Sequence, residues 1–113
     1  METKDAVKAL VAIGHESRLA VYRLLIQKGP AGLAAGELAK LTGIPPSSLS
    51  FHLKELVHAD LLASRQEGRF VFYAVKYDSM TQLLAYLTEN CCGGNPCTPM
   101  TSMQCSPNVE SDS

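Results

Sequence analysis

The sequence has no tryptophan, no cysteine before residue 91 and no long apolar run. Without tryptophan, any core must be built from aliphatic side chains with a few Phe and Tyr. No apolar stretch approaches the ~20 residues that a membrane-spanning helix needs. The first residues carry acids and no long apolar stretch follows them, so they are unlike a secretory signal. We therefore expect a cytoplasmic protein with no membrane partner.

Net charge is nearly absent as well. The 113 residues carry ten Lys and Arg against eleven Asp and Glu, a formal charge of −1. Residues 1–90 hold all ten basic side chains and nine of the acids, so this part has a charge of +1. A chain of this length has room for one domain. Because nucleic-acid-binding domains are usually basic, any affinity for DNA must come from where individual charges are placed.

The four cysteines all fall in the short stretch from Cys91 to Cys105. Disulfides that stabilise a fold join distant segments, whereas a cluster this tight joins none. In a cytoplasmic protein such a cluster more often binds metal or takes part in redox chemistry. Gly, Pro, Ser, Thr and Asn are frequent around it, and hydrophobic periodicity is lost. We therefore divide the chain into a folded domain over residues 1–90 and a flexible tail over residues 91–113.

Hydrophobic spacing predicts two helices at the start of the chain, over residues 4–13 and 16–27. The first has a single apolar face, formed by Val7, Leu10 and Val11. The second is apolar around most of its circumference, which is typical of a central, buried helix.

Two further helices are expected over residues 34–41 and 46–58, joined by a short turn that contains Gly43. Two short helices around a tight glycine-containing turn are typical of a helix-turn-helix motif. The second of them is amphipathic, with apolar residues at Leu49, Leu53, Leu56 and Val57. Its other face makes it the candidate recognition helix. The residues of that face predicted to contact DNA are Ser47, Ser48, Ser50, His52 and Lys54.

A β-hairpin is predicted over residues 61–75. The run from Phe70 to Tyr73 favours a strand, and Gly68 supplies the positive φ that a tight turn requires. Arg65 and Arg69 flank the tip of the hairpin and are candidates for contact with DNA phosphates or the minor groove. A hairpin directly after a helix-turn-helix is a wing.

A last helix is expected over residues 77–90, capped by Asp78 or a neighbour, with an apolar stripe of Met80, Leu83, Leu84 and Leu87. This stripe predicts both core packing and a dimer interface. The predicted fold class is therefore mainly α with a β-hairpin wing, a winged helix-turn-helix of order α-α-α-α-β-β-α.

The order of these elements and the stretch Ser48-Leu-Ser-Phe-His-Leu-Lys-Glu-Leu56 resemble the ArsR/SmtB family of metalloregulatory repressors. The family's recognition helix typically reads Ser-x-His-Leu-x-x-Leu, which this chain matches at Ser50, His52, Leu53 and Leu56. Ser17-Arg18-Leu19 resembles the family's Thr-Arg-Leu segment, although His15-Glu16 stands where the family usually has Asp. The resemblance implies a repressor, not an enzyme, that binds double-stranded operator DNA. It also implies a homodimer whose interface is formed by the first and last helices.

The resemblance also implies a sensor site, whose position differs between members. One arsenic site uses cysteines ahead of the recognition helix and a zinc site uses Asp and His of the last helix; this chain has no cysteine in the first region and no histidine in the second. Some arsenic-responsive members carry a vicinal pair and a third cysteine at the end of the last helix, and Cys91, Cys92 and Cys97 look like that arrangement. Three thiolates suit trivalent arsenic, and antimonite by the same logic, because soft ligands select thiophilic ions. No organic cofactor is expected.

Other interpretations of these cysteines stay open, namely another soft metal, thiol redox sensing, or no function. Zinc prefers four ligands in a tetrahedron, and Cys105 would then be the fourth. A metal-independent winged-helix DNA-binding module is the alternative function. The hypothesis that we favour is a repressor of an arsenic-resistance operon that leaves its operator when trivalent arsenic binds the three cysteines.

Overall fold

The computed structural model describes residues 1–89, and residues 90–113 lie outside that description. The described part holds five helices and a three-stranded antiparallel sheet. The helices are α1 (Thr3–Ile13), α2 (Glu16–Lys28), α3 (Ala35–Thr42), α4 (Pro46–His58) and α5 (Tyr77–Leu87), and the strands are β1 (Leu33–Ala34), β2 (Leu62–Glu67) and β3 (Phe70–Val75). The predicted winged helix-turn-helix fold is therefore confirmed. The predicted division into domain and tail falls at the edge of the described residues and stays a prediction.

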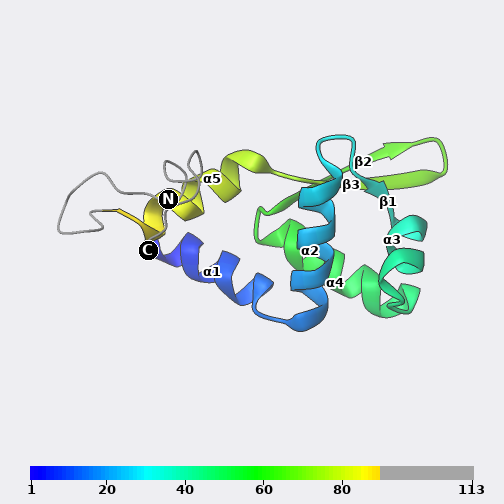
Figure 1. Cartoon of the computed structure of the whole chain (residues 1–113), viewed down its shortest axis with the longest axis horizontal. Coiled ribbons are helices and arrows are strands. Elements are labelled where there is room, and N and C mark those ends of the chain that lie inside the picture. The colour runs from blue at the N-terminus through cyan, green and yellow to red at the C-terminus, as the bar shows by residue number, and fades with distance from the viewer. Residues whose placement is uncertain (90–113) are drawn as a thin grey trace, which may run out of the picture.

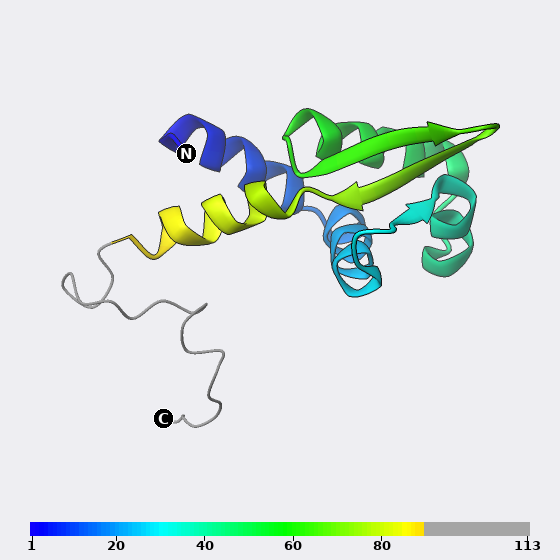
Figure 2. The same ribbon diagram turned by 90° about the horizontal axis from the view of Figure 1, so that it is seen from above.

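The two ends of the molecule carry different elements. Helices α1 and α5 lie side by side at one end, and α3 lies at the other (Figure 1). Figure 2 shows that the β2–β3 hairpin also projects toward the α3 end, away from α1 and α5. The recognition-helix candidate α4 therefore lies in a module with the wing, and the first and last helices form a separate flank.

The core lies where α2 and α4 pack under the sheet. Its most deeply buried large side chains are Val21, Leu25, Leu38, Leu49, Leu53, Leu56, Leu61 and Leu62. Three of these leucines belong to α4 and recur every three or four residues, so one face of that helix is sealed in the core. The prediction for this face of α4 is confirmed, and its polar side must point outward.

Helix α1 buries its small residues and exposes its large apolar ones. The residues that α1 buries are its alanines, Ala6, Ala9 and Ala12. The larger side chains of Val7, Leu10 and Val11 are 51%, 44% and 66% exposed. Because alanine is small, α1 can approach its neighbouring helices closely through that face, and this leaves an apolar stripe on the surface of the molecule.

Helix α2 is also less buried than its composition predicts. Only Val21, Tyr22 and Leu25 are buried, and Leu19 is 43% exposed. The sheet and α4 cover one side of the helix and leave the other side to solvent. The helix begins at an unusual cap, because Nδ1 of His15 accepts a hydrogen bond from the backbone N–H of Ser17 at 3.1 Å. His15 thus caps the helix in place of the Asp that is usual at this position in the family it resembles.

The short strand β1 was not predicted from the sequence. Leu33 pairs with Tyr73 and Ala34 with Phe72, so the sheet has the order β1-β3-β2. Two residues are too few to show the alternation that identifies a strand. Gly32 precedes the strand with φ 72°, and a Cβ there would lie 2.2 Å from the carbonyl oxygen of Tyr73. Only glycine fits this close approach.

The predicted hairpin of the wing is confirmed, and the predicted last helix is confirmed in part. Gly68 has φ 62° at the hairpin turn, as its tight geometry requires. Helix α5 ends at Leu87 instead of continuing to residue 90. The predicted cap is wrong, because the helix begins after Lys76 without a side-chain cap and Asp78 lies inside the first turn.

Candidate nucleic-acid interface

The outward face of α4 carries most of the predicted DNA contacts. Pro46 occupies the first turn, where its missing N–H costs no hydrogen bond. The buried leucines of α4 then fix how the helix is rotated about its axis. As a result Ser47, Ser48, Ser50 and Lys54 are all exposed. The arrangement places hydroxyl groups and one ammonium on a convex helical surface that a major groove can accommodate.

His52 lies at the edge of this face. Its ring is half-buried, and Nδ1 accepts a hydrogen bond from Nη1 of Arg18 at 3.2 Å, because a guanidinium can only donate. The ring centroid lies 4.7 Å from that of His15. Burial, with His15 and Arg18 as further causes, holds the pKa of His52 below its ordinary value of 6.5. The imidazole is therefore neutral at neutral pH, and its contact with DNA stays a prediction.

Arg18, in α2, forms hydrogen bonds to both α1 and the recognition-helix candidate α4. Its Nε donates to the carbonyl oxygen of Ala12, near the end of α1, at 2.6 Å. Its Nη1 reaches His52 in α4. One side chain of α2 thus connects the flank of the molecule to the candidate DNA-contacting helix. The role of Arg18 could not be predicted from the sequence, because contacts between distant helices leave no local pattern.

The two arginines of the wing differ in how they are held. Nε of Arg65 lies 2.6 Å from Oε2 of Glu67, and Nη2 donates to the carbonyl oxygen of Ala31 at 3.1 Å. The same guanidinium stacks over the ring of Phe72, 4.8 Å from its centroid. Arg69 is exposed at the turn, and the described part of the chain shows no ion pair to it. Both arginines remain predicted DNA contacts. Arg65 would have to break intramolecular contacts to bind a phosphate, whereas Arg69 is not held by an ion pair within residues 1–89.

One exposed residue of α4 was missed. Phe51 is 56% exposed, and its ring meets that of His52 edge-on with the centroids 5.8 Å apart. Its position between Leu49 and Leu53 places it opposite the buried face. The signal was present in the sequence, because a helical projection puts Phe51 among the polar residues.

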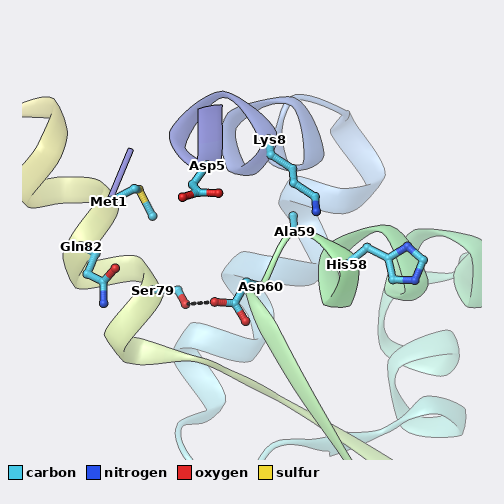
Figure 3. Close-up of a pocket in the computed structure, with 8 residues that line it drawn as sticks. All are labelled: Met1, Asp5, Lys8, His58, Ala59, Asp60, Ser79 and Gln82. Carbon is cyan, nitrogen blue, oxygen red and sulfur yellow. Dashed lines mark hydrogen bonds between the residues drawn. The ribbon is translucent and has the colours of Figure 1, made fainter. Parts of the chain in front are cut away.

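A pocket of about 220 Å³ lies at the far end of α4, walled by side chains of α1 and α5 (Figure 3). Asp60, with φ 65°, accepts a hydrogen bond from Oγ of Ser79 at 3.1 Å and pairs with Lys76. The hydrogen bond from Lys76, followed by that from Ser79, holds the pKa of Asp60 below its ordinary value. These bonds fasten the turn after α4 to the start of α5.

The predicted metal ligands Cys91, Cys92 and Cys97 lie outside the described residues, as does Cys105. Over residues 1–89, no three His, Cys, Asp or Glu side chains are grouped so that they could hold a metal ion. No helix of this part of the chain has the length and apolar character to cross a membrane.

Comparison with known proteins identifies the family of this chain. Residues 13–65 match the family described as "Helix-turn-helix domain". YceK of Bacillus subtilis, described as an uncharacterized HTH-type transcriptional regulator, is 31% identical over 90 residues, which span 78% of this chain and 89% of YceK. The chain belongs to the family of HTH-type transcriptional regulators. This agrees with the expectation that it is a transcriptional regulator.

Two solved structures share the fold of this HTH-type regulator. HlyU from Vibrio cholerae superposes with a TM-score of 0.63 at 29% identity, over 81% of this chain and 99% of HlyU. A homodimeric winged helix-turn-helix DNA-binding domain from Mycobacterium bovis gives a TM-score of 0.63 at 21% identity, over 83% of this chain and 87% of that one. The regulator therefore has the winged helix-turn-helix fold of these two proteins, which confirms the resemblance at the level of the fold.

Proposed function

We propose that this regulator is a cytoplasmic repressor that binds operator DNA as a homodimer and is released when trivalent arsenic binds Cys91, Cys92 and Cys97. The observation that carries the DNA-binding part is the outward face of α4, which holds exposed hydroxyls and Lys54 on a helix whose rotation is fixed by the core. The arsenic part rests on the spacing of the cysteines in the sequence.

The chemistry of the α4 face suits the major groove. Hydroxyl groups can donate to or accept from base edges, and Lys54 can meet a phosphate or a guanine. Arg69 at the wing tip supplies a second positive charge beyond the end of α4. Because the domain is almost neutral, few phosphates are neutralised on binding. The salt dependence of binding should therefore be shallow, about one unit of log–log slope for each phosphate contact.

A homodimer follows from the exposed flank. Val7, Leu10 and Val11 of α1 and Leu87 of α5 are each more than 40% exposed, and the two helices lie side by side. Contiguous apolar surface of this kind usually marks an interface. Two recognition helices about 34 Å apart would then read successive major grooves. The homodimeric domain from Mycobacterium bovis, which shares the fold, supports the same assembly.

The inducer part of the proposal is chemical. Trivalent arsenic forms three bonds, and Cys91, Cys92 and Cys97 offer three soft sulfur ligands within seven residues. The cluster follows α5 closely in the sequence, and α5 belongs to the proposed dimer flank. Binding there could favour a dimer geometry that no longer fits DNA. To move the regulator from almost fully bound to almost fully released requires about 5.5 kcal/mol of differential binding.

The test is fluorescence anisotropy of the full chain on labelled duplex DNA from the region upstream of its own gene, titrated with arsenite, antimonite, zinc, cadmium and a peroxide. We expect arsenite and antimonite to release the DNA. A variant with Cys91→Ser, Cys92→Ser and Cys97→Ser should bind DNA and ignore arsenite, whereas the control Cys105→Ser should respond like the unmodified chain. A triple variant that still responds would refute the site. Release by zinc, cadmium or peroxide instead would favour the alternative sensors.

A further inference from the structure

The recognition-helix candidate exposes an aromatic ring where a polar side chain would be expected. Phe51 is 56% exposed, whereas the three leucines of the same helix, Leu49, Leu53 and Leu56, are at most 2% exposed. Exposing a phenyl ring to water is unfavourable, because apolar surface is stabilised by leaving water. A ring in this place is therefore a candidate for burial by whatever covers α4.

The geometry of the helix puts Phe51 at the centre of its outer face. Residues three and four apart lie on the same side of a helix. Ser47 and Lys54 therefore flank Phe51, one turn before it and one turn after it, and both are exposed. The core leucines occupy the opposite side. When α4 enters a groove, Phe51 is the side chain directed to its floor, and Lys54 beside it is suited to the negative charge of DNA.

The orientation of the ring is restrained from one side. Its neighbour His52 contacts it edge-on, and His52 is itself held by Arg18 and by the ring of His15. An aromatic ring supported in this way loses little conformational freedom when it binds. This is a favourable starting point for a contact that depends on shape.

We propose that Phe51 reads the C5-methyl group of a pyrimidine, thymine in unmodified DNA, in the major groove of each half-site. The base edges in that groove present donors and acceptors with a single apolar group, which is the thymine methyl. A phenyl side chain forms no hydrogen bond to the polar edges, so the methyl is the one feature for which it has affinity. This inference rests on the proposed DNA-binding function and adds a specificity-determining residue to it.

The experiment begins with selection of a binding duplex from a random library, using the full chain. Each thymine of the selected site is then replaced singly by uracil, which lacks only the methyl group, and affinity is measured by fluorescence anisotropy. For the unmodified chain we expect a three- to fivefold loss at one or two positions per half-site, the value of burying about one methyl-sized group. In the variant Phe51→Ala, uracil should cost nothing at those positions.

Two controls make the outcome specific. Phe70→Ala removes a phenyl ring that is 63% exposed on the wing, and it should retain the full effect of uracil. In a further pair of duplexes, the sensitive thymine is replaced by cytosine or by 5-methylcytosine. The unmodified chain should bind the 5-methylcytosine duplex more tightly than the cytosine duplex, because 5-methylcytosine carries the same methyl group as thymine. Phe51→Ala should bind the two duplexes equally. Equal uracil profiles for the unmodified chain and Phe51→Ala would overturn the inference while leaving DNA binding intact. Failure to select any duplex would overturn both this inference and the proposed function.

Discussion

At the scale of single residues, the structure is most informative about Arg18 and His52. Neither side chain is fully exposed or fully buried, and each completes the hydrogen bonding of the other. Arg18 also satisfies the carbonyl oxygen of Ala12, which lies in the last turn of α1 and has no partner within that helix. A substitution of either residue should therefore change the stability of the domain more directly than it changes any contact with DNA.

Arg18→Ala should lower the free energy of unfolding by about 1.5–3 kcal/mol, the usual effect of removing hydrogen bonds from a charged donor. Urea denaturation followed by circular dichroism measures this change. The matched control is Arg23→Ala, which removes an exposed arginine from the same helix and should change stability by less than about 0.5 kcal/mol. Equal losses in the two variants would show that the bonds of Arg18 contribute nothing of their own.

The lowered pKa of His52 predicts a pH dependence with a definite sign. Between the folded-state pKa and the ordinary value of 6.5, the unfolded chain binds more protons than the folded chain. The contribution of His52 to stability is therefore complete above pH 6.5 and is lost as pH falls through the folded-state pKa. In urea titrations from about pH 7.5 to 5, His52→Gln should lose less stability than the unmodified chain. A steeper loss in the variant would contradict the assignment.

At the scale of elements, the connection between wing and helix-turn-helix depends on β1. This two-residue strand attaches the segment before α3 to β3 of the wing. Gly32 makes the attachment possible, because its positive φ brings the backbone against Tyr73. The orientation of the wing relative to α3 and α4 is therefore set partly by a strand too short to form alone.

Gly32→Ala should destabilise the domain by more than Gly43→Ala. Both glycines have nearly the same backbone conformation, φ 72° and 73°, so both substitutions carry the same cost of about 1–2 kcal/mol for a left-handed residue. A Cβ at Gly43 meets nothing within 4 Å, whereas one at Gly32 collides with the backbone of β3. The difference between their free energies of unfolding should be about 1–3 kcal/mol. Equal values would show that β1 separates from β3 at little cost.

At the scale of the whole molecule, the described domain has two distinct exposed surfaces. One is the polar face of α4 with the wing, which we assign to DNA. The other is the apolar flank of α1 and α5, which we assign to a second copy of the chain. Arg18 bridges the two, since it bonds to both α1 and α4. A change in how the dimer packs could reach the recognition helix through this side chain.

Val11→Glu should convert the regulator to a monomer without unfolding it, because this side chain is 66% exposed and a buried carboxylate at an interface is strongly unfavourable. Size-exclusion chromatography with light scattering measures the mass, and circular dichroism checks the fold. Leu41→Glu is the control, since Leu41 is 64% exposed but lies on α3. The proposed interface is wrong if Val11→Glu stays a dimer or if only Leu41→Glu dissociates.

The local part of this protein was predictable from its sequence. The helix-turn-helix, the wing and the buried leucines of α4 were all predicted, because a 3.6-residue period and a few turn glycines are encoded within short segments. The predicted DNA contacts on α4 and the wing were placed by the same local rules, and their surfaces exist where expected. Their roles, and the cysteine site beyond the described residues, remain predictions that only binding experiments can test.

The features that could not be predicted depend on partners that are distant along the chain. The spacing of its residues makes α1 amphipathic, but packing against the neighbouring helices turns its alanines inward and its Val and Leu outward. The sequence determined that α4 carries a polar face, but Arg18 and His15 decided that His52 turns to the edge of it. The physical reason is the same in both cases. A helix's period marks which residues share a face, while the shape and hydrogen-bonding groups of its neighbours select the face that is buried.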